Sequence, residues 1–288
     1  MRLHNAVLLT VWVGGTSAVP AAVPQVAQSV PAVPALPPMA FEGAVTRGGA
    51  KIWFGTVGKG PPVILLHGGL SSSRAWGAQV PALVMAGYRV VLIDSRGHGR
   101  STLGARPLSY ELMAQDVIAV MDSLALRRAA IIGWSDGAII GLVLAMRHGA
   151  RVDRIYAFGA NMDQKGVRND AVEAPVLREI APRLAADHAD LSRDPNGFLA
   201  LHRAVRTMQK TQPRYRAQQL ASIRDVAVTI ADGAHDEFIT DVHPGYLAHA
   251  IPCAKLEIYP NAGHFAPWQN AATFNRALLA FLGLKDSP

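Results

Sequence analysis

Short apolar runs that end in glycine or polar residues recur along this chain, with longer amphipathic stretches between them. The clearest are "PPVILLHGG", "RVVLIDSRG" and "AAIIGWSDG". A short continuous apolar run bounded by turn residues is typical of a strand buried on both faces. Strands that alternate with helices pair in parallel through right-handed crossovers, so the pattern predicts the α/β class, with a mostly parallel central sheet and helices on both faces.

One long segment interrupts this alternation. We expect strands in residues 51–57, 61–69, 88–94, 128–134, 154–160, 226–233 and 254–260, and helices over 76–86, 110–124, 138–148 and 270–282. Residues 161–222 are polar and helical in pattern, without a strong strand. They are therefore predicted to form a helical cap inserted between two strands of the sheet.

The first residues are predicted to direct export. Residues 1–21 carry one Arg near the start, an apolar stretch from Ala6 to Val13 and then small residues, which is typical of a signal peptide. The stretch is shorter than the roughly 20 residues that span a bilayer, so we expect a periplasmic or secreted protein with no stable membrane anchor after processing. Residues 22–40 are rich in Pro and Ala and predict an extended leader, followed by the folded domain over 41–288.

Composition narrows the range of functions. With 50% hydrophobic and 17% charged residues, a chain of 288 residues has enough apolar surface to bury a full core. The formal net charge is +7, but the basic residues are scattered, so no nucleic-acid partner is expected. Cys253 is the single cysteine, which excludes an intrachain disulfide and a cysteine-based metal site.

The pentapeptide Gly133-Trp134-Ser135-Asp136-Gly137 fits the G-x-S-x-G pattern of a nucleophile elbow. Glycines on both sides of a Ser permit the sharp turn from strand to helix that exposes its Oγ. The alternative is a tight turn in which the Ser caps the following helix. In parallel sheets, ligands bind beyond the carboxyl ends of the strands, where this pentapeptide is predicted to lie.

A Ser hydroxyl needs a base to take its proton and an acid to orient that base. His264, in "YPNAGHFAPW", follows the last predicted strand, and Asp236, in "ADGAHDEF", follows the strand before it. The order Ser135, Asp236, His264 is the one expected of a hydrolase elbow on an α/β sheet. These three residues are the predicted catalytic triad.

Three other carboxylates compete with Asp236 as the acid. Glu237 is its direct neighbour, and Asp163 follows the strand "RIYAFGA". Asp232 ends its own strand and is expected to serve the turn. The sequence leaves the choice open, with Glu237 the strongest rival.

Acyl transfer also needs hydrogen-bond donors for the developing oxyanion. One predicted donor is the backbone N–H of Asp136, at the start of the helix after the nucleophile. The other is the N–H of Gly69 in the loop after "VILLHGG", with Leu70 as the neighbour that substitutes for it. His67 is expected to brace this loop rather than to react.

The segments "LLHGG", "DSRGHGRS", "GWSDG", "DGAHDEF" and "AGHFAPW" together resemble the α/β-hydrolase family, over about residues 41–284. "GWSDGAIIG" followed by "FGAN" is similar to the valacyclovir hydrolase (biphenyl hydrolase-like) branch. That resemblance implies that the carboxylate of Asp136 recognises the amino group of α-amino acid esters. The alternative is that an Arg of the cap or the amides of the helix N-terminus neutralise this carboxylate.

The predicted function is therefore a serine esterase: hydrolysis of a small-molecule carboxylic ester, or of a related acyl bond such as a lactone or an amino acid ester. We expect no metal and no cofactor, and substrate contacts from Asp136, Trp134 and Leu70. A haloalkane dehalogenase is disfavoured because it would carry Asp in place of Ser135. Cofactor-free perhydrolysis with the same triad remains an alternative, as does a non-catalytic binding protein on the same fold, although no triad member is missing.

Overall fold

The computed structural model describes residues 30–252 and 254–283, and an eight-stranded sheet crosses its middle in the order β1-β2-β4-β3-β5-β6-β7-β8. The strands are β1 (Phe41–Arg47), β2 (Ala50–Val57), β3 (Pro62–Leu66), β4 (Arg89–Ile93), β5 (Ala129–Trp134), β6 (Val152–Phe158), β7 (Ala227–Gly233) and β8 (Lys255–Tyr259). β2 pairs antiparallel with β1 and with β4, and all other pairs are parallel. The predicted mostly parallel sheet is confirmed.

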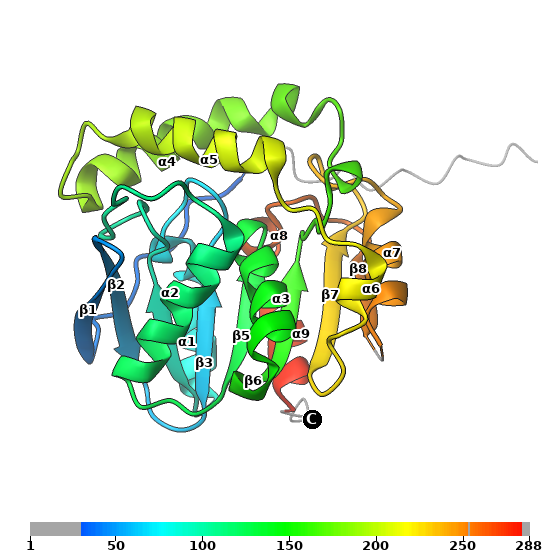
Figure 1. Ribbon diagram of the computed structural model, residues 1–288, viewed down its shortest axis with the longest axis horizontal. Helices are drawn as coiled ribbons and strands as arrows, with labels where there is room; N and C mark the ends of the chain where they lie inside the picture. Colours follow the sequence, from blue (N-terminus) through cyan, green and yellow to red (C-terminus); the bar gives the residue numbers. More distant parts are fainter. Residues whose placement is uncertain (1–29, 253, 284–288) are drawn as a thin grey trace, which may run out of the picture.

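Successive residues of the central strands enter two different cores. Ile64 and Leu66 of β3 belong to the core beneath α2 (Tyr110–Ser123) and α3 (Asp136–His148). Val63 and Leu65 belong to the opposite core, with residues of α1 (Gln79–Met85) and α9 (Ala271–Leu282). Figure 1 shows α2 and α3 in front of the sheet and α1 and α9 behind it. Apolar residues on both faces explain why these strands read as continuous apolar runs.

β1 and α7 (His243–Ala250) are among the elements that were not expected from the sequence. β1 lies at the edge of the sheet, and its residues are only partly covered, so it has no continuous apolar run. α7 contains Pro and Gly, which weaken a helix signal, but its Pro lies in the first turn, where the missing N–H does no harm.

The chain between β6 and β7 forms the cap. Its elements are η3 (Gln164–Gly166), η4 (Ala171–Glu173), α4 (Val176–Leu191), α5 (Phe198–Thr211) and the short α6 (Ala217–Leu220). Figure 1 shows α4 and α5 lying across the top of the sheet. Leu201, Val205 and Met208 recur along one face of α5 and are buried in the core that α2 and α3 share. The cap is thereby fixed to the body by apolar packing.

The residues that precede β1 in the sequence pack against the folded body. Val30 is only 3% exposed, and its N–H donates to Glu179 of α4 at 3.1 Å. Arg183 of α4 donates to the carbonyl oxygen of Val30 at 2.8 Å. The folded domain was predicted to begin near residue 41, where β1 begins, but residues 30–40 of the predicted extended leader already pack against the body. The predicted signal peptide, residues 1–21, lies outside the described residues.

Candidate active site

The loop between β5 and α3 forms a strained turn at Ser135. Ser135 has φ 56° and ψ −123°, a backbone conformation that residues other than glycine rarely adopt. A Cβ atom at Gly133 would lie 2.4 Å from the carbonyl oxygen of Gly137, and one at Gly137 would lie 2.0 Å from that of Leu66. The turn therefore requires both glycines. The Ser135 side chain makes no capping hydrogen bond to α3, so the helix-cap alternative is wrong.

The loops after β7 and β8 bring Asp236 and His264 into contact. His264 Nδ1 lies 2.6 Å from Asp236 Oδ2, and both side chains are almost fully buried. The other carboxylate oxygen of Asp236 accepts the backbone N–H groups of Phe238 and Ile239, at 2.7 and 2.8 Å. Because the whole carboxylate is engaged, its orientation toward the imidazole is fixed.

The three competing carboxylates lie elsewhere. Glu237 accepts the backbone N–H of His264 at 2.9 Å and does not bond its ring. Asp163 caps η3 by accepting the N–H of Lys165 at 2.7 Å. Asp232 accepts the N–H of Gly233 at 2.8 Å, the turn role expected of it. Within the part of the chain that the structure describes, Asp236 is the carboxylate hydrogen-bonded to the His264 ring.

Electrostatics favour an ionised Asp236 beside a basic imidazole. Burial by itself would lower the pKa of His264, but attraction to the carboxylates of Asp236, Glu237 and Asp136 raises it above its ordinary value. Burial would raise the pKa of Asp236, yet the charge and hydrogen bond of His264 hold it below the usual range. Burial and the neighbouring charge of Asp236 raise the pKa of Asp232 well above its ordinary value.

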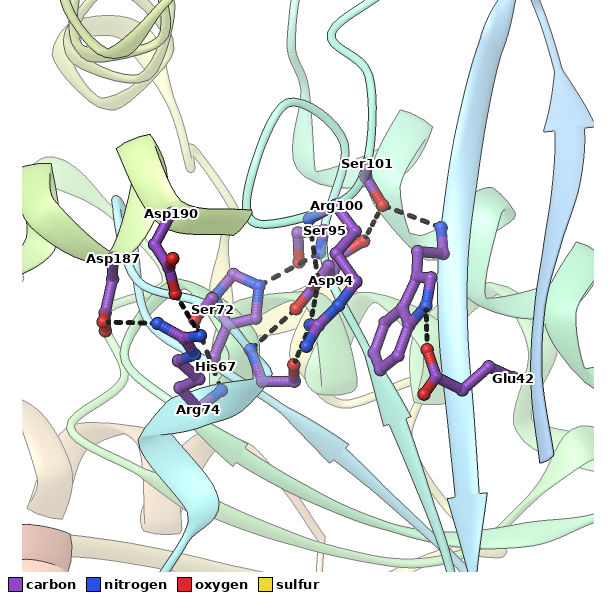
Figure 2. A network of polar contacts seen from close by, with 12 residues as sticks. Glu42, His67, Ser72, Arg74, Asp94, Ser95, Arg100, Ser101, Asp187 and Asp190 are labelled. Carbon is purple, nitrogen blue, oxygen red and sulfur yellow. Dashed lines mark hydrogen bonds and ion pairs between the residues drawn. The ribbon is translucent and has the colours of Figure 1, made fainter. Parts of the chain in front are cut away.

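The His67 side chain stabilises the loop after β3 through hydrogen bonds, as expected. Its Nδ1 donates to the carbonyl oxygen of Gly68 at 2.8 Å, and its Nε2 accepts the N–H of Ser95 at 3.0 Å. Figure 2 shows the same network continuing to Asp94, which accepts the N–H of Ser73 at 2.7 Å. Burial lowers the pKa of His67, so the ring is neutral and suited to this bracing role.

Gly69 and Asp136 meet beside Ser135, the predicted nucleophile. A Cβ atom at Gly69 would lie 2.6 Å from Asp136 Oδ2, so the Gly69 backbone lies close against the Asp136 carboxylate. Asp136 is the first residue of α3, directly after Ser135. Gly69, Leu70 and Asp136 all line the cavity that contains Ser135. The structure therefore brings the predicted oxyanion donors and the predicted nucleophile to one place.

The carboxylate of Asp136 is engaged by neutral donors. The hydroxyl of Tyr110 donates to Oδ1 at 2.8 Å, and the amide of Gln209 lies 3.2 and 3.1 Å from the two oxygens. Burial raises the pKa of Asp136, and these two hydrogen bonds partly oppose that effect. The sequence alternatives for its partner were an Arg of the cap or helix amides. Tyr110 and Gln209 come from α2 and α5, far away in sequence, and no local motif marks them.

Trp134 supports the His264 loop. Its indole Nε1 donates to the carbonyl oxygen of His264 at 2.8 Å, and its ring packs against Phe265 and Trp268. Trp134 also lines the cavity, as expected of a substrate contact. The elbow pattern gives no sign of its hydrogen bond, because the pattern leaves that position free.

A cavity of about 550 Å³ lies between the cap and these loops. Its wall beneath η4 and α4 is apolar and includes Val172, Leu177, Ile180 and Leu184, with Phe238 and Phe265 from the body. Its wall beneath α5 is polar and includes His202, Arg206, Gln209 and Lys210. Ser135 and His264 lie in the same cavity. Among the described residues, no group of three or more His, Cys, Asp or Glu side chains is arranged to hold a metal ion.

Comparisons with known proteins agree with this arrangement. Residues 63–277 match the model of the Alpha/beta hydrolase family. The 2-hydroxy-6-oxo-6-phenylhexa-2,4-dienoate hydrolase of Burkholderia cepacia is 26% identical over 266 residues, which cover 81% of this chain and 91% of that protein.

Two solved structures show the same fold. The enol-lactonase of Burkholderia xenovorans LB400 superposes with a TM-score of 0.67 at 22% identity, over 84% of this chain and 100% of that one. The carboxylesterase CesB of Bacillus subtilis superposes with a TM-score of 0.67 at 23% identity, over 84% of this chain and 91% of that one.

Proposed function

Because the chain belongs to the α/β-hydrolase family and is a hydrolase of that type, we propose that it cleaves a carboxylic ester, or a related acyl bond such as a lactone, through an acyl-enzyme on Ser135. The observation that carries the proposal is the 2.6 Å contact between His264 and Asp236 in the cavity that Ser135 lines. A strained elbow, a base and a fixed acid are the parts that nucleophilic acyl transfer needs.

The first half of the reaction forms the acyl-enzyme. Asp236 holds Nδ1 of His264, which leaves Nε2 to take the proton of the Ser135 hydroxyl as Oγ attacks the ester carbonyl. The negative charge on the carbonyl oxygen is stabilised by the backbone N–H groups of Gly69 and Asp136, at the N-terminus of α3. When the intermediate collapses, the bond to the leaving oxygen breaks, and His264 returns the proton to the departing alcohol.

The second half releases the acid. Water gives a proton to His264 and attacks the acyl carbon, and the same two amides stabilise the second oxyanion. Collapse breaks the bond to Oγ, and His264 returns the proton to Ser135. The carboxylate of Asp236 stabilises the imidazolium in both halves, in line with the raised pKa of His264.

The test combines labelling with turnover. We expect a fluorophosphonate probe to label the wild-type protein at Ser135, and Ser135→Ala to remove both the label and hydrolysis of p-nitrophenyl esters. His264→Ala should reduce turnover by about a thousandfold or more with the fold intact. Near-normal turnover in either variant, or equal labelling of Ser135→Ala, would show that the mechanism is wrong.

A further inference from the structure

Helix α5 presents a polar face to the cavity. His202, Arg206 and Gln209 follow one another at intervals of four and three residues, which places them on one side of a helix. All three line the cavity, as does Lys210. The apolar residues of α5 fix the helix to the core, so this polar face is held over the site. Gln209 donates a hydrogen bond to Asp136. Arg206 is a half-buried cation on the same face.

Arg206 has no counter-ion in the described structure. No carboxylate of residues 30–252 or 254–283 forms an ion pair with it. Arg168, another cation at the cavity, is paired with Asp170 and Asp241. A partly desolvated guanidinium is stabilised when an anion reaches it, and its planar fork matches a carboxylate. The cavity therefore offers an anion a position that the protein itself leaves unfilled.

The opposite wall suits a different chemical group. Leu177, Ile180 and Leu184 of α4 face the cavity from one side of their helix, and Val172 of η4 adds a further apolar side chain. An apolar chain placed there would bury hydrocarbon surface, at roughly 25 cal/mol per Å² removed from water. Ser135 and His264 lie in the cavity that these two unlike walls share.

From this division, and resting on the proposed function, we infer that the substrate is an amphipathic anionic ester or lactone. Its apolar part lies against α4, its scissile carbonyl lies at Ser135, and a carboxylate elsewhere in the same molecule is bound by Arg206. Arg206 thus determines specificity, and Lys210 and His202 beside it add donors for the same group. The carboxylate of Asp136 is engaged by Tyr110 and Gln209, so it is not the partner of Arg206.

The test compares two esters with the same apolar acyl chain, one with a free carboxylate on its alcohol part and one with that carboxylate methylated. We expect the wild type to have the higher kcat/KM for the free acid. Arg206→Gln should lower kcat/KM for the free acid by about tenfold or more, mainly through KM, and leave the methylated ester within about twofold. Arg206→Lys should have a kcat/KM for the free acid between those of the wild type and Arg206→Gln.

Arg203→Gln is the matched control, because it removes the same charge from an exposed position of α5 that does not line the cavity. It should leave both esters unchanged. An equal effect of Arg203→Gln and Arg206→Gln, or an equal loss for both esters in Arg206→Gln, would overturn the inference.

A binding measurement separates this inference from the proposed function. The probe is the amide analogue of the free-acid ester, bound to Ser135→Ala and followed by calorimetry with and without Arg206→Gln. Weaker binding on loss of Arg206 supports the anion site even if no ester is hydrolysed. Equal binding in the two proteins would overturn the anion site even if ester hydrolysis is demonstrated.

Discussion

The indole of Trp134 donates a hydrogen bond to the backbone carbonyl oxygen of His264 at 2.8 Å. The residue directly before the proposed nucleophile therefore holds the loop that carries the proposed base. A serine and a histidine 129 positions apart in the chain are in this way connected through one buried side chain. We expect the relative position of Ser135 and His264 to depend on this bond as well as on the sheet.

The first prediction concerns this bond. Trp134→Phe keeps an aromatic ring but removes the donor, so we expect kcat/KM for a p-nitrophenyl ester to fall by about tenfold and the free energy of unfolding by about 1 kcal/mol. Trp268→Phe is the control, because its Nε1 donates to the carbonyl oxygen of Ala75 at 2.9 Å, away from His264. It should lose similar stability and keep its kcat. Equal loss of kcat in both variants would contradict the positioning role.

The second prediction distinguishes the two neighbouring acids. Asp236→Asn removes the charge that stabilises the His264 imidazolium, so kcat should fall by about a thousandfold or more. Glu237→Gln keeps an oxygen that accepts the backbone N–H of His264, so at its best pH it should retain most of its activity. Steady-state kinetics of both variants provide the measurement. The reverse ranking would assign the acid to Glu237.

The third prediction concerns pH. His264 acts as a base only when neutral, and its pKa is raised above the ordinary 6.5 by Asp236, Glu237 and Asp136. We therefore expect kcat/KM to fall as the pH drops through an apparent pKa above 6.5. Glu237→Gln removes one negative charge, so its acidic limb should move to lower pH. A shift to higher pH would show that Glu237 does not act on His264 through its charge.

The fourth prediction concerns the space behind the imidazole. Gly159 has φ +64°, and a Cβ atom there would lie 2.8 Å from Cε1 of His264. Gly159→Ala should displace the ring and reduce kcat by about a hundredfold. Gly49→Ala is the control, because Gly49 has φ +76° with nothing within 4 Å of the added atom. Thermal unfolding should report backbone strain in both variants, and kinetics should report a loss only in Gly159→Ala.

The fifth prediction concerns Asp136. Its two oxygens already accept from Tyr110 and Gln209, so we expect only a small preference for amino acid esters. The measurement is the ratio of kcat/KM for an amino acid benzyl ester and its des-amino analogue, in the wild type and in Asp136→Asn. The ratio should change by less than about fivefold between the two proteins. A larger change would show that Asp136 recognises the amino group.

The sequence by itself determined the sheet, the elbow and the approximate place of the candidate site. Strands buried on both faces read as unbroken apolar runs, and the carboxyl ends of parallel strands converge. Ser135, Asp236 and His264 were therefore predicted from their positions after strands. The elbow requires its flanking glycines, because a Cβ atom added at either one would lie only 2.0 to 2.4 Å from a backbone oxygen. These signals are local, because they depend on a few consecutive residues.

Only the tertiary structure decided which side chains touch. Asp236 and Glu237 are adjacent in sequence, yet one bonds the His264 ring and the other its backbone N–H. Gln209 reaches Asp136 across 73 positions, and Val30 reaches Glu179 across 149. Such contacts leave no periodic trace in the sequence, because they depend on how the helices and loops pack and on the direction that each side chain takes from its backbone.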